Sequence, residues 1–342
     1  MAWAKPEYTK SQVDRAGKAI AADADIFKND IHYSIINNWR SSHAYPLNTF
    51  QVTLRNKANS LSRNFSVSQR IKRLESIKRK LSSGTMQLSQ MQDIAGCRAV
   101  VENIKIVNAL YDKYHSYGDH SLRNEKNYIL NPKDDGYRSL HLIFKYKGRD
   151  TRKDYDGLQI EIQIRSQDQH AWATAVEAVG TFTKQALKWR GGSAEWQRFF
   201  ALMSSAIAVR EDSAPVPGTP NSLTELRKEI AQLSNQLRVK DTLNAYNLTL
   251  QYVGNLSKSD AKILLVHMIP GENKVAVRGF RLRDSQIANQ SYIDLEKTIP
   301  SDSSSQAVLV RVDSLQALQR AYPNYFLDTG RFSTILNEIL RK

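Results

Sequence analysis

The sequence of 342 residues has one cysteine, few prolines and no long apolar run. With Cys97 alone, an internal disulfide cannot form and a zinc site built from several thiolates is excluded. Any metal site must use carboxylates or histidines, which favours hard cations such as Mg²⁺. No segment reaches the roughly 18 apolar residues of a membrane span, and the N-terminus lacks the apolar core of a secretory signal. We expect a folded, cytoplasmic protein that does not bind a membrane, with Cys97 buried in an apolar stretch.

Basic residues exceed acidic ones, with 49 Lys and Arg against 34 Asp and Glu, a net charge of +15. Residues 261–342 carry 11 basic and 8 acidic side chains, so +12 of this charge falls within residues 1–260. Such an excess attracts polyanions such as nucleotides or RNA. A basic surface without any partner would have the same composition.

The apolar periodicity predicts an α+β fold, in which a mixed β-sheet is flanked by helices. The clearest alternation covers residues 158–165, where Gln159, Glu161, Gln163 and Arg165 share one face and four apolar residues share the other. Other strands are expected at 96–101 and 139–146. Helices are expected at 11–22, 26–41, 47–61, 67–81, 103–115, 167–187 and 194–210.

The segment 211–221 contains three prolines and is predicted to be a linker. Beyond it, the pattern predicts a helix from Ser222 to about 236, a hairpin within 262–282, a strand at 307–312, a helix ending near 321 and a short helix from Thr329. We therefore predict a catalytic domain over 1–210, a linker with helices over 211–260 and a small α/β domain over 261–342.

Glycine-rich phosphate-binding loops are missing, so side-chain cations must bind any phosphate. On the predicted basic helix, Ser76 and Lys80 share a face, with Lys72 one turn earlier. Asp93 precedes one strand and Glu161 lies on the polar face of another. Two carboxylates among cations can hold Mg²⁺ on a nucleotide polyphosphate. A solvated cationic helix and ordinary ion pairs are the alternatives.

A turn that contains glycine lies between the two carboxylates, in the sequence Asn131-Pro132-Lys133-Asp134-Asp135-Gly136-Tyr137-Arg138-Ser139-Leu140-His141. Lys133 and Tyr137 flank this turn, which allows the tyrosine to stack on a base and the lysine to contact a phosphate. The same sequence also fits a hairpin with a surface tyrosine.

Four motifs occur in order over about 70–180, namely RIK…S…K, QDIAGCR, NPKDDGYRSLH, and EIQIRS with HAWATAVE. They resemble the RelA/SpoT alarmone synthetase domain. The resemblance implies transfer of the β,γ-pyrophosphate of ATP to a ribose 3′-hydroxyl, with Mg²⁺ as cofactor. By position, it implies adenine contacts from Arg70 and Arg98, phosphate contacts from Lys72, Ser76 and Lys80, catalytic metal ligands in Asp93 and Glu161, and acceptor contacts from Lys133, Tyr137, His141, Gln163 and Arg165.

Two features of long family members are missing. None of the seven histidines is followed by aspartate, as the family's hydrolase half requires, and the long regulatory tail with ribosome contacts is not found. We therefore expect a small, stand-alone synthetase without hydrolase activity.

The segment Asn38-Trp39-Arg40-Ser41-Ser42-His43-Ala44-Tyr45-Pro46-Leu47 and the helix HAWATAVEAVG resemble CapRel-like antiphage proteins, which fuse a toxin to its antitoxin. This resemblance implies that the acceptor is the 3′-CCA end of tRNA. It also implies a zinc-finger-shaped C-terminal domain without zinc, whose Tyr322 and Tyr325 cover the ATP site until a phage protein binds. The alternatives are a (p)ppGpp or (p)ppApp synthetase acting on GDP or GTP, and an inactive nucleotide- or RNA-binding regulator. The tyrosines could also simply pack in a small core.

Overall fold

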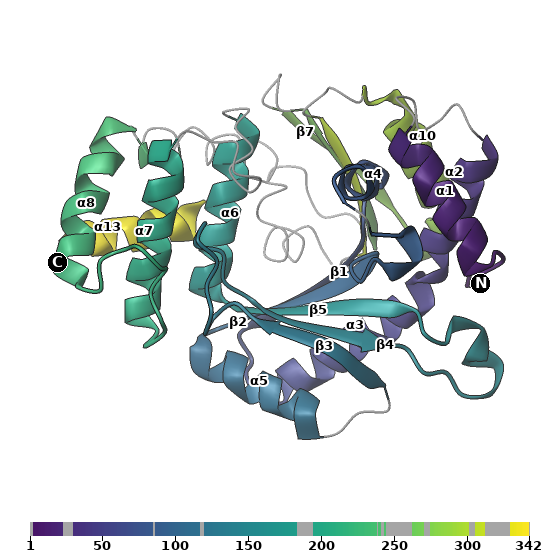
Figure 1. Ribbon diagram of the computed structural model, residues 1–342, viewed down its shortest axis with the longest axis horizontal. Coiled ribbons are helices and arrows are strands. Elements are labelled where there is room, and N and C mark those ends of the chain that lie inside the picture. The colour runs from purple at the N-terminus through teal and green to yellow at the C-terminus, as the bar shows by residue number, and fades with distance from the viewer. Residues whose placement is uncertain are drawn as a thin grey trace.

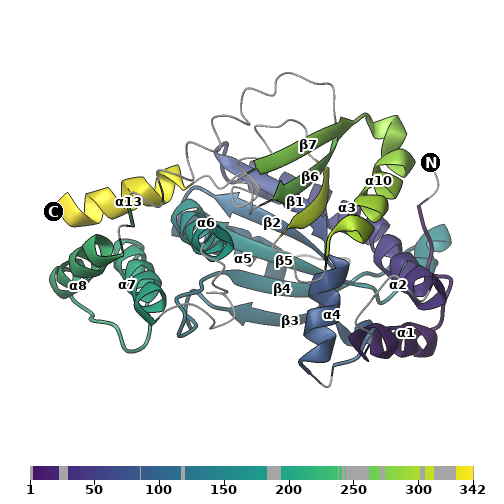
Figure 2. The ribbon, with the colours of Figure 1, turned by 90° about the horizontal axis from the view of Figure 1, so that it is seen from above.

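A computed structural model describes residues 3–22, 30–84, 86–116, 120–182, 194–237, 239–240, 243, 262–269, 274–300, 305–311 and 329–341. These residues include two β-sheets, one of five strands and one of three, with helices around them (Figures 1 and 2). The helices are α1 Lys10–Ala22, α2 Asp30–Ser42, α3 Ala44–Asn59, α4 Leu74–Ser82, α5 Ile104–Ser116, α6 Gln167–Phe182, α7 Ala194–Arg210, α8 Leu223–Gln236, α10 Ser285–Thr298 and α13 Gly330–Arg341. The strands are β1 Phe65–Ile71, β2 Ala95–Val101, β3 Ser121–Asn127, β4 Leu140–Lys145, β5 Gln159–Ser166, β6 Ile263–Ile269, β7 Lys274–Phe280 and β8 Gln306–Arg311.

The larger sheet has five strands in the order β1-β2-β5-β4-β3. The β2–β5 pair is parallel, and the β1–β2, β4–β5 and β3–β4 pairs are antiparallel. The predicted α+β fold with a mixed sheet is therefore confirmed. The parallel pair places the ends of two strands that are far apart in the sequence at the same edge of the sheet.

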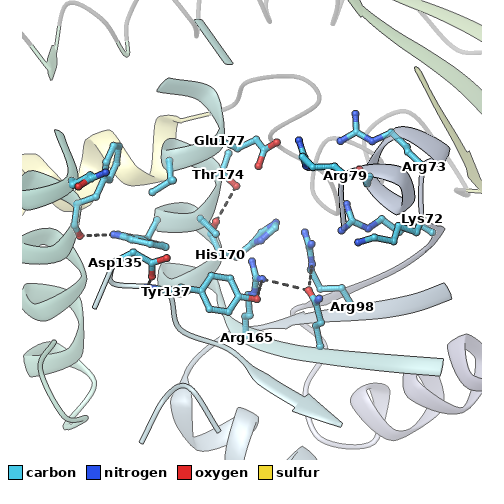
Figure 3. A pocket seen from close by; sticks show the side chains of 18 of the residues that line it. Lys72, Arg73, Arg79, Arg98, Asp135, Tyr137, Arg165, His170, Thr174 and Glu177 are labelled. Atoms are coloured by element: carbon cyan, nitrogen blue, oxygen red, sulfur yellow. Dashed lines mark hydrogen bonds between the residues drawn. The ribbon is translucent and has the colours of Figure 1, made fainter. Parts of the chain in front are cut away.

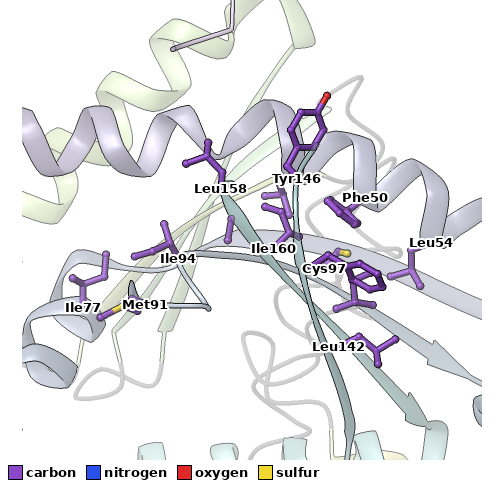
Figure 4. Packing of buried hydrophobic residues seen from close by; sticks show 14 of the residues in the cluster. Phe50, Leu54, Ile77, Met91, Ile94, Cys97, Leu142, Tyr146, Leu158 and Ile160 are labelled. Atoms are coloured by element: carbon purple, nitrogen blue, oxygen red, sulfur yellow. The ribbon is translucent and has the colours of Figure 1, made fainter. Parts of the chain in front are cut away.

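One face of this sheet is apolar because the strands alternate with a period of two. Ile160, Ile162 and Ile164 are fully buried on that face, which α3 and α5 cover (Figure 4). Cys97 lies in the same cluster, packed among its members, as the sequence indicated. The polar residues of the same strands are thereby directed to the opposite face, where the site lies.

The predicted helix over 67–81 is wrong in its first half. Residues 65–71 form β1, which pairs antiparallel with β2, and the helix α4 begins at Leu74. Val67 and Ile71 are β-branched and suit a strand, whereas the Lys- and Arg-rich sequence alone resembles an exposed helix. Arg70 therefore lies on a strand and Lys72 on the connection, and the two do not continue the helical face of Ser76 and Lys80.

The edge strand β3 is a second difference from the prediction. Its sequence SLRNEKN is almost wholly exposed and shows no apolar alternation, so periodicity gives no signal. It exists as a strand because it pairs with β4 along its length.

The C-terminal part forms a three-stranded antiparallel sheet of order β7-β6-β8, with α10 packed against it. The predicted hairpin, the 307–312 strand and the last helix are confirmed, whereas the helix predicted to end near 321 lies outside the described residues. The helix α13 does not join this sheet. Its buried residues, Phe332, Ile335, Leu336 and Ile339, pack with α6, α7 and α8. Among the described residues, no helix is long and apolar enough to cross a membrane.

Candidate active site

The polar face of the five-stranded sheet gathers the predicted site residues by strand register. Gly96 of β2 lies opposite Arg70 of β1 on one side and Glu161 of β5 on the other. Arg98 pairs with Gln163, which in turn pairs with His141 of β4. Paired residues on neighbouring strands share a face, so these side chains lie on one surface. A Cβ on residue 96 would lie 2.9 Å from the backbone oxygen of Glu161, so only glycine fits there.

A cavity of about 260 Å³ lies above this face, between the sheet, α4 and α6 (Figure 3). Figure 3 shows Lys72, Arg73 and Arg79 on one wall and His170, Thr174 and Glu177 of α6 on the other. Seven of the predicted site residues line the cavity, namely Arg70, Lys72, Ser76, Arg98, Tyr137, Gln163 and Arg165. Its volume falls just below the range of small-molecule sites, which begins at about 300 Å³.

Asp93 is bonded by two ammonium groups beside the cavity. Its Oδ2 accepts from Lys72 Nζ and its Oδ1 from Lys80 Nζ, both at 2.9 Å. Burial raises the pKa of Asp93, but Lys72 and Lys80 outweigh it and hold that pKa at about 2. Burial in turn lowers the pKa of Lys72, which Asp93 partly restores. Asp93 is therefore ionised at neutral pH and fixes two of the predicted phosphate-binding cations.

Glu161, His141 and Tyr137 form a hydrogen-bonded chain on the other side. His141 Nδ1 lies 2.9 Å from Glu161 Oε1, and His141 Nε2 lies 2.8 Å from the Tyr137 hydroxyl. Gln163 Nε2 donates to Glu161 Oε2 at 2.8 Å. Burial raises the pKa of Glu161, but the bond and charge of His141 lower it below its usual value. Burial lowers the pKa of His141, but Tyr137 and Glu161 raise it.

The turn before Tyr137 has the predicted form. Gly136 N donates to Lys133 O at 2.8 Å, and Gly136 has a φ of +89°, which favours glycine. Lys133 Nζ lies 5.2 Å from the centroid of the Tyr137 ring, and Arg165 Cζ lies 4.9 Å from it. The predicted catalytic, ATP-binding and acceptor-binding residues therefore lie together, since each lines the cavity, contacts a residue that lines it or, as Lys80 does, reaches one through Asp93.

Several lining residues were not predicted as site residues. Arg73 and Arg79 come from the basic segment, Asp135 from the turn, and His170, Thr174 and Glu177 from α6. The spacing of three to four residues between His170, Thr174 and Glu177 places them on one helical face, a signal that the HAWATAVE motif contains. Tyr322 and Tyr325, predicted to cover the ATP site, lie outside the described residues.

Asp93 and Glu161 lie near enough for their charges to interact, since Asp93 acts to raise the pKa of Glu161. Two hard carboxylate oxygens fit Mg²⁺, which typically takes one or two carboxylates plus phosphate oxygens and water. Among the described residues, no group of three or more His, Cys, Asp or Glu could hold a metal ion. The donor set therefore suits a metal that arrives with a polyphosphate, rather than a cage built from protein ligands.

The chain is similar to known proteins over the region of the site. The family described as "Region found in RelA / SpoT proteins" matches residues 69–186. GTP pyrophosphokinase of Haemophilus influenzae is 26% identical over 161 residues, which are 47% of this chain and 20% of that protein. GTP pyrophosphokinase YjbM of Bacillus subtilis is 26% identical over 169 residues, 48% of this chain and 73% of that one. The crystal structure of small alarmone synthetase 1 from Bacillus subtilis has 23% identity and a TM-score of 0.42, covering 56% of this chain and 94% of that one.

Residues 69–186 thus match a region found in RelA/SpoT proteins, and the two curated relatives are named GTP pyrophosphokinases. These similarities support the prediction of a RelA/SpoT-type pyrophosphotransferase. The matched stretch spans a fifth of the length of the H. influenzae relative.

Proposed function

We propose that this chain transfers the β,γ-pyrophosphate of ATP to the 3′-hydroxyl of a ribose. The observation that carries the proposal is the division of the site. Cations from β1, the following connection and α4 line one side of the cavity, and Tyr137, which His141 links to Glu161 by hydrogen bonds, lines it farther along. The relatives that match this region are named GTP pyrophosphokinases.

The cationic wall supplies the donor subsite. Arg70 and Arg98 lie on adjacent strands of the polar face and are assigned to adenine, whereas Lys72, Ser76 and Lys80 are assigned to the phosphates. Fixed cations stabilise the charge that develops on a transferred phosphoryl group without reorganising during the reaction. Mg²⁺ held by Asp93 and Glu161 would neutralise further phosphate charge when bound.

The reaction balances with the groups at hand. The ribose 3′-oxygen bonds to the β-phosphorus, the bond from that phosphorus to the α,β-bridging oxygen breaks, and AMP leaves with the bridging oxygen. The hydroxyl proton passes to Glu161, whose lowered pKa keeps it ionised at neutral pH. Gln163 and His141 orient its two oxygens by hydrogen bonds.

For the acceptor, we propose the 3′ end of tRNA, and the +12 charge of residues 1–260 supports it because an RNA presents many phosphates. The second candidate is GDP or GTP, favoured by the names of the relatives. In either case Tyr137 would stack on the acceptor base. We further propose that the chain is an autoinhibited antiphage toxin–antitoxin fusion, in which Tyr322 and Tyr325 cover the ATP site until a phage protein binds.

The test uses the chain with Tyr322→Ala and Tyr325→Ala, in which the proposed autoinhibition is relieved, and offers it ATP labelled in the γ-phosphate together with GDP, GTP or bulk tRNA. Label in RNA supports the tRNA acceptor, and label in a nucleotide supports the guanine nucleotide. Release of the label as phosphate alone would refute pyrophosphotransfer. Glu161→Gln should abolish transfer, while Asp154→Asn, a change of the same kind at the exposed Lys5 ion pair, should leave it unchanged. The double change Tyr322→Ala and Tyr325→Ala should make the chain more toxic to its host, and equal toxicity would refute autoinhibition.

A further inference from the structure

The helix α4 receives a hydrogen-bond acceptor at its start from a distant part of the chain. The residue at its N-cap position, Arg73, makes no side-chain capping bond in the described structure. The amide of Leu74 donates instead to Glu296 Oε1 at 3.2 Å, across 222 residues of sequence. Glu296 belongs to α10, and a carboxylate is favourable at a helix N-terminus because the first amides lack partners there.

Glu296 is fixed in this position by a buried polar cluster. The Tyr292 hydroxyl donates to Glu296 Oε1 at 2.7 Å, and Arg40 Nη1 lies 3.6 Å from Glu296 Oε2. Arg40 Nη2 also donates to the Tyr292 hydroxyl at 3.0 Å. All three residues are buried, with exposures of 5 to 8%. The charges of Arg40 and Glu296 therefore compensate each other away from water.

The same cluster also bonds to the connection between β1 and α4. Arg40 Nε donates to the carbonyl of Lys72 at 3.1 Å. The connection from β1 to α4 is therefore bonded on both sides of Arg73, at the Lys72 carbonyl by Arg40 and at the Leu74 amide by Glu296. The ammonium group of Lys72 in turn bonds to Asp93.

A second cavity of about 540 Å³ lies behind this connection, between α2, α10 and β1. Arg70, Ile71 and Arg73 line both this cavity and the smaller one at the site. The backbone amide of Lys72 donates to Ile94 O at 2.7 Å, which fixes the strand side of the connection. The bonds from Arg40 and Glu296 add to this on the other side, at the Lys72 carbonyl and at the first amide of α4.

We propose that Glu296 is a positioning residue for the donor subsite, which sets the start of α4 and, with Arg40, the place of Lys72. The predicted effect of Glu296 on ATP binding rests on the proposed function. Its effect on α4 itself does not depend on which reaction the chain performs. Glu296 touches neither substrate nor metal in this scheme and acts through α4 and Lys72.

The test compares Glu296→Ala and Glu296→Gln with a matched control on the same helix. Asp294→Ala removes an exposed carboxylate that accepts from Gln290. Glu296→Ala should speed hydrogen exchange of the first α4 amides about tenfold, as expected for a lost cap. It should raise the KM for ATP several-fold while leaving the KM for the acceptor unchanged. Glu296→Gln should have a smaller effect because its amide oxygen still accepts from Leu74.

Glu296→Ala leaves Arg40 buried without its partner and can prevent folding. The pair Arg40→Met with Glu296→Leu removes both charges, and thermal unfolding checks that it folds. Fast α4 exchange and a raised KM for ATP in this pair support the proposal. Exchange and KM equal to those of the parent, or a higher activity in any Glu296 variant, would overturn it. If the chain with Tyr322→Ala and Tyr325→Ala transfers no pyrophosphate but α4 exchange responds as expected, the proposed function fails and the positioning role stands.

Discussion

Tyr137 is expected to ionise at a lower pH than the other tyrosines. Burial raises its pKa, but the Arg165 guanidinium and His141 outweigh burial and bring that pKa to about 8. Arg165 donates to the phenol oxygen, and His141 Nε2 lies 2.8 Å from it. Every other described tyrosine with a shifted pKa is shifted upward, which makes this ionisation separable in a titration.

The lowering of this pKa from 10.0 to about 8 corresponds to roughly 3 kcal/mol in favour of the phenolate. Because the folded pKa lies below the unfolded one, the unfolded chain holds more protons between these two values. The free energy of unfolding should therefore rise through this window, by up to about 3 kcal/mol from Tyr137 alone. Arg165→Met removes the largest lowering influence, and burial should then carry the pKa above 10.

The assay follows the ultraviolet absorbance of tyrosinate against pH. The parent should show one tyrosine titrating near pH 8, which Tyr137→Phe should eliminate and Arg165→Met should move above pH 10. The reasoning is refuted if the parent shows no titration below pH 9. It is equally refuted if the early transition survives Tyr137→Phe or ignores Arg165→Met.

Three further changes test other parts of the structure. Asp93→Asn should lower the free energy of unfolding by roughly 2 kcal/mol at pH 7, measured by urea denaturation. This loss should fade as the pH drops from about 4 towards 2, because the carboxylate of the parent becomes protonated there. A loss independent of pH would contradict the pairing with Lys72. Gly136→Ala should lower the melting temperature by an amount equivalent to about 1–3 kcal/mol, because its φ is +89° and its new Cβ would lie 2.9 Å from Trp172. Cys97 is buried, which raises the pKa of its thiol, so it should react with thiol reagents only after unfolding.

Much of the fold is predictable from alternation along the strands. The β5 segment has apolar residues at every second position, and the structure buries those residues and turns Glu161 and Gln163 to the other face. The strand β1 was predicted as helix because its pairing with β2 is a long-range effect that local propensity does not contain. The exposed β3 has no apolar face to detect.

The sequence is enough to identify the candidate site residues, but it does not reveal their hydrogen-bond partners. The sequence places Asp93 and two lysines in one region, whereas the two 2.9 Å bonds depend on where β1 ends and α4 begins. The link between Glu161 and Tyr137 through His141 depends on the register of β4 against β5. Such contacts are set by strand pairing between distant segments, which spacing along the chain does not reveal.

Two of the helices that border the cavity, α4 and α6, are held by residues beyond 210. Glu296 bonds the start of α4, and Arg331 Nε donates to Asp168 near the start of α6 at 2.8 Å. Phe332 and three other buried residues of α13 cover α6 and α7, and each buried side chain of this size is worth roughly 1.5–3 kcal/mol. A fragment of residues 1–210 should therefore melt well below the full chain, bind a dye for exposed apolar surface and show faster hydrogen exchange in α6. The full chain with Asp294→Ala serves as control. A fragment as stable as the full chain, with unchanged α6 exchange, would show that α13 and α10 contribute nothing to the walls of the site.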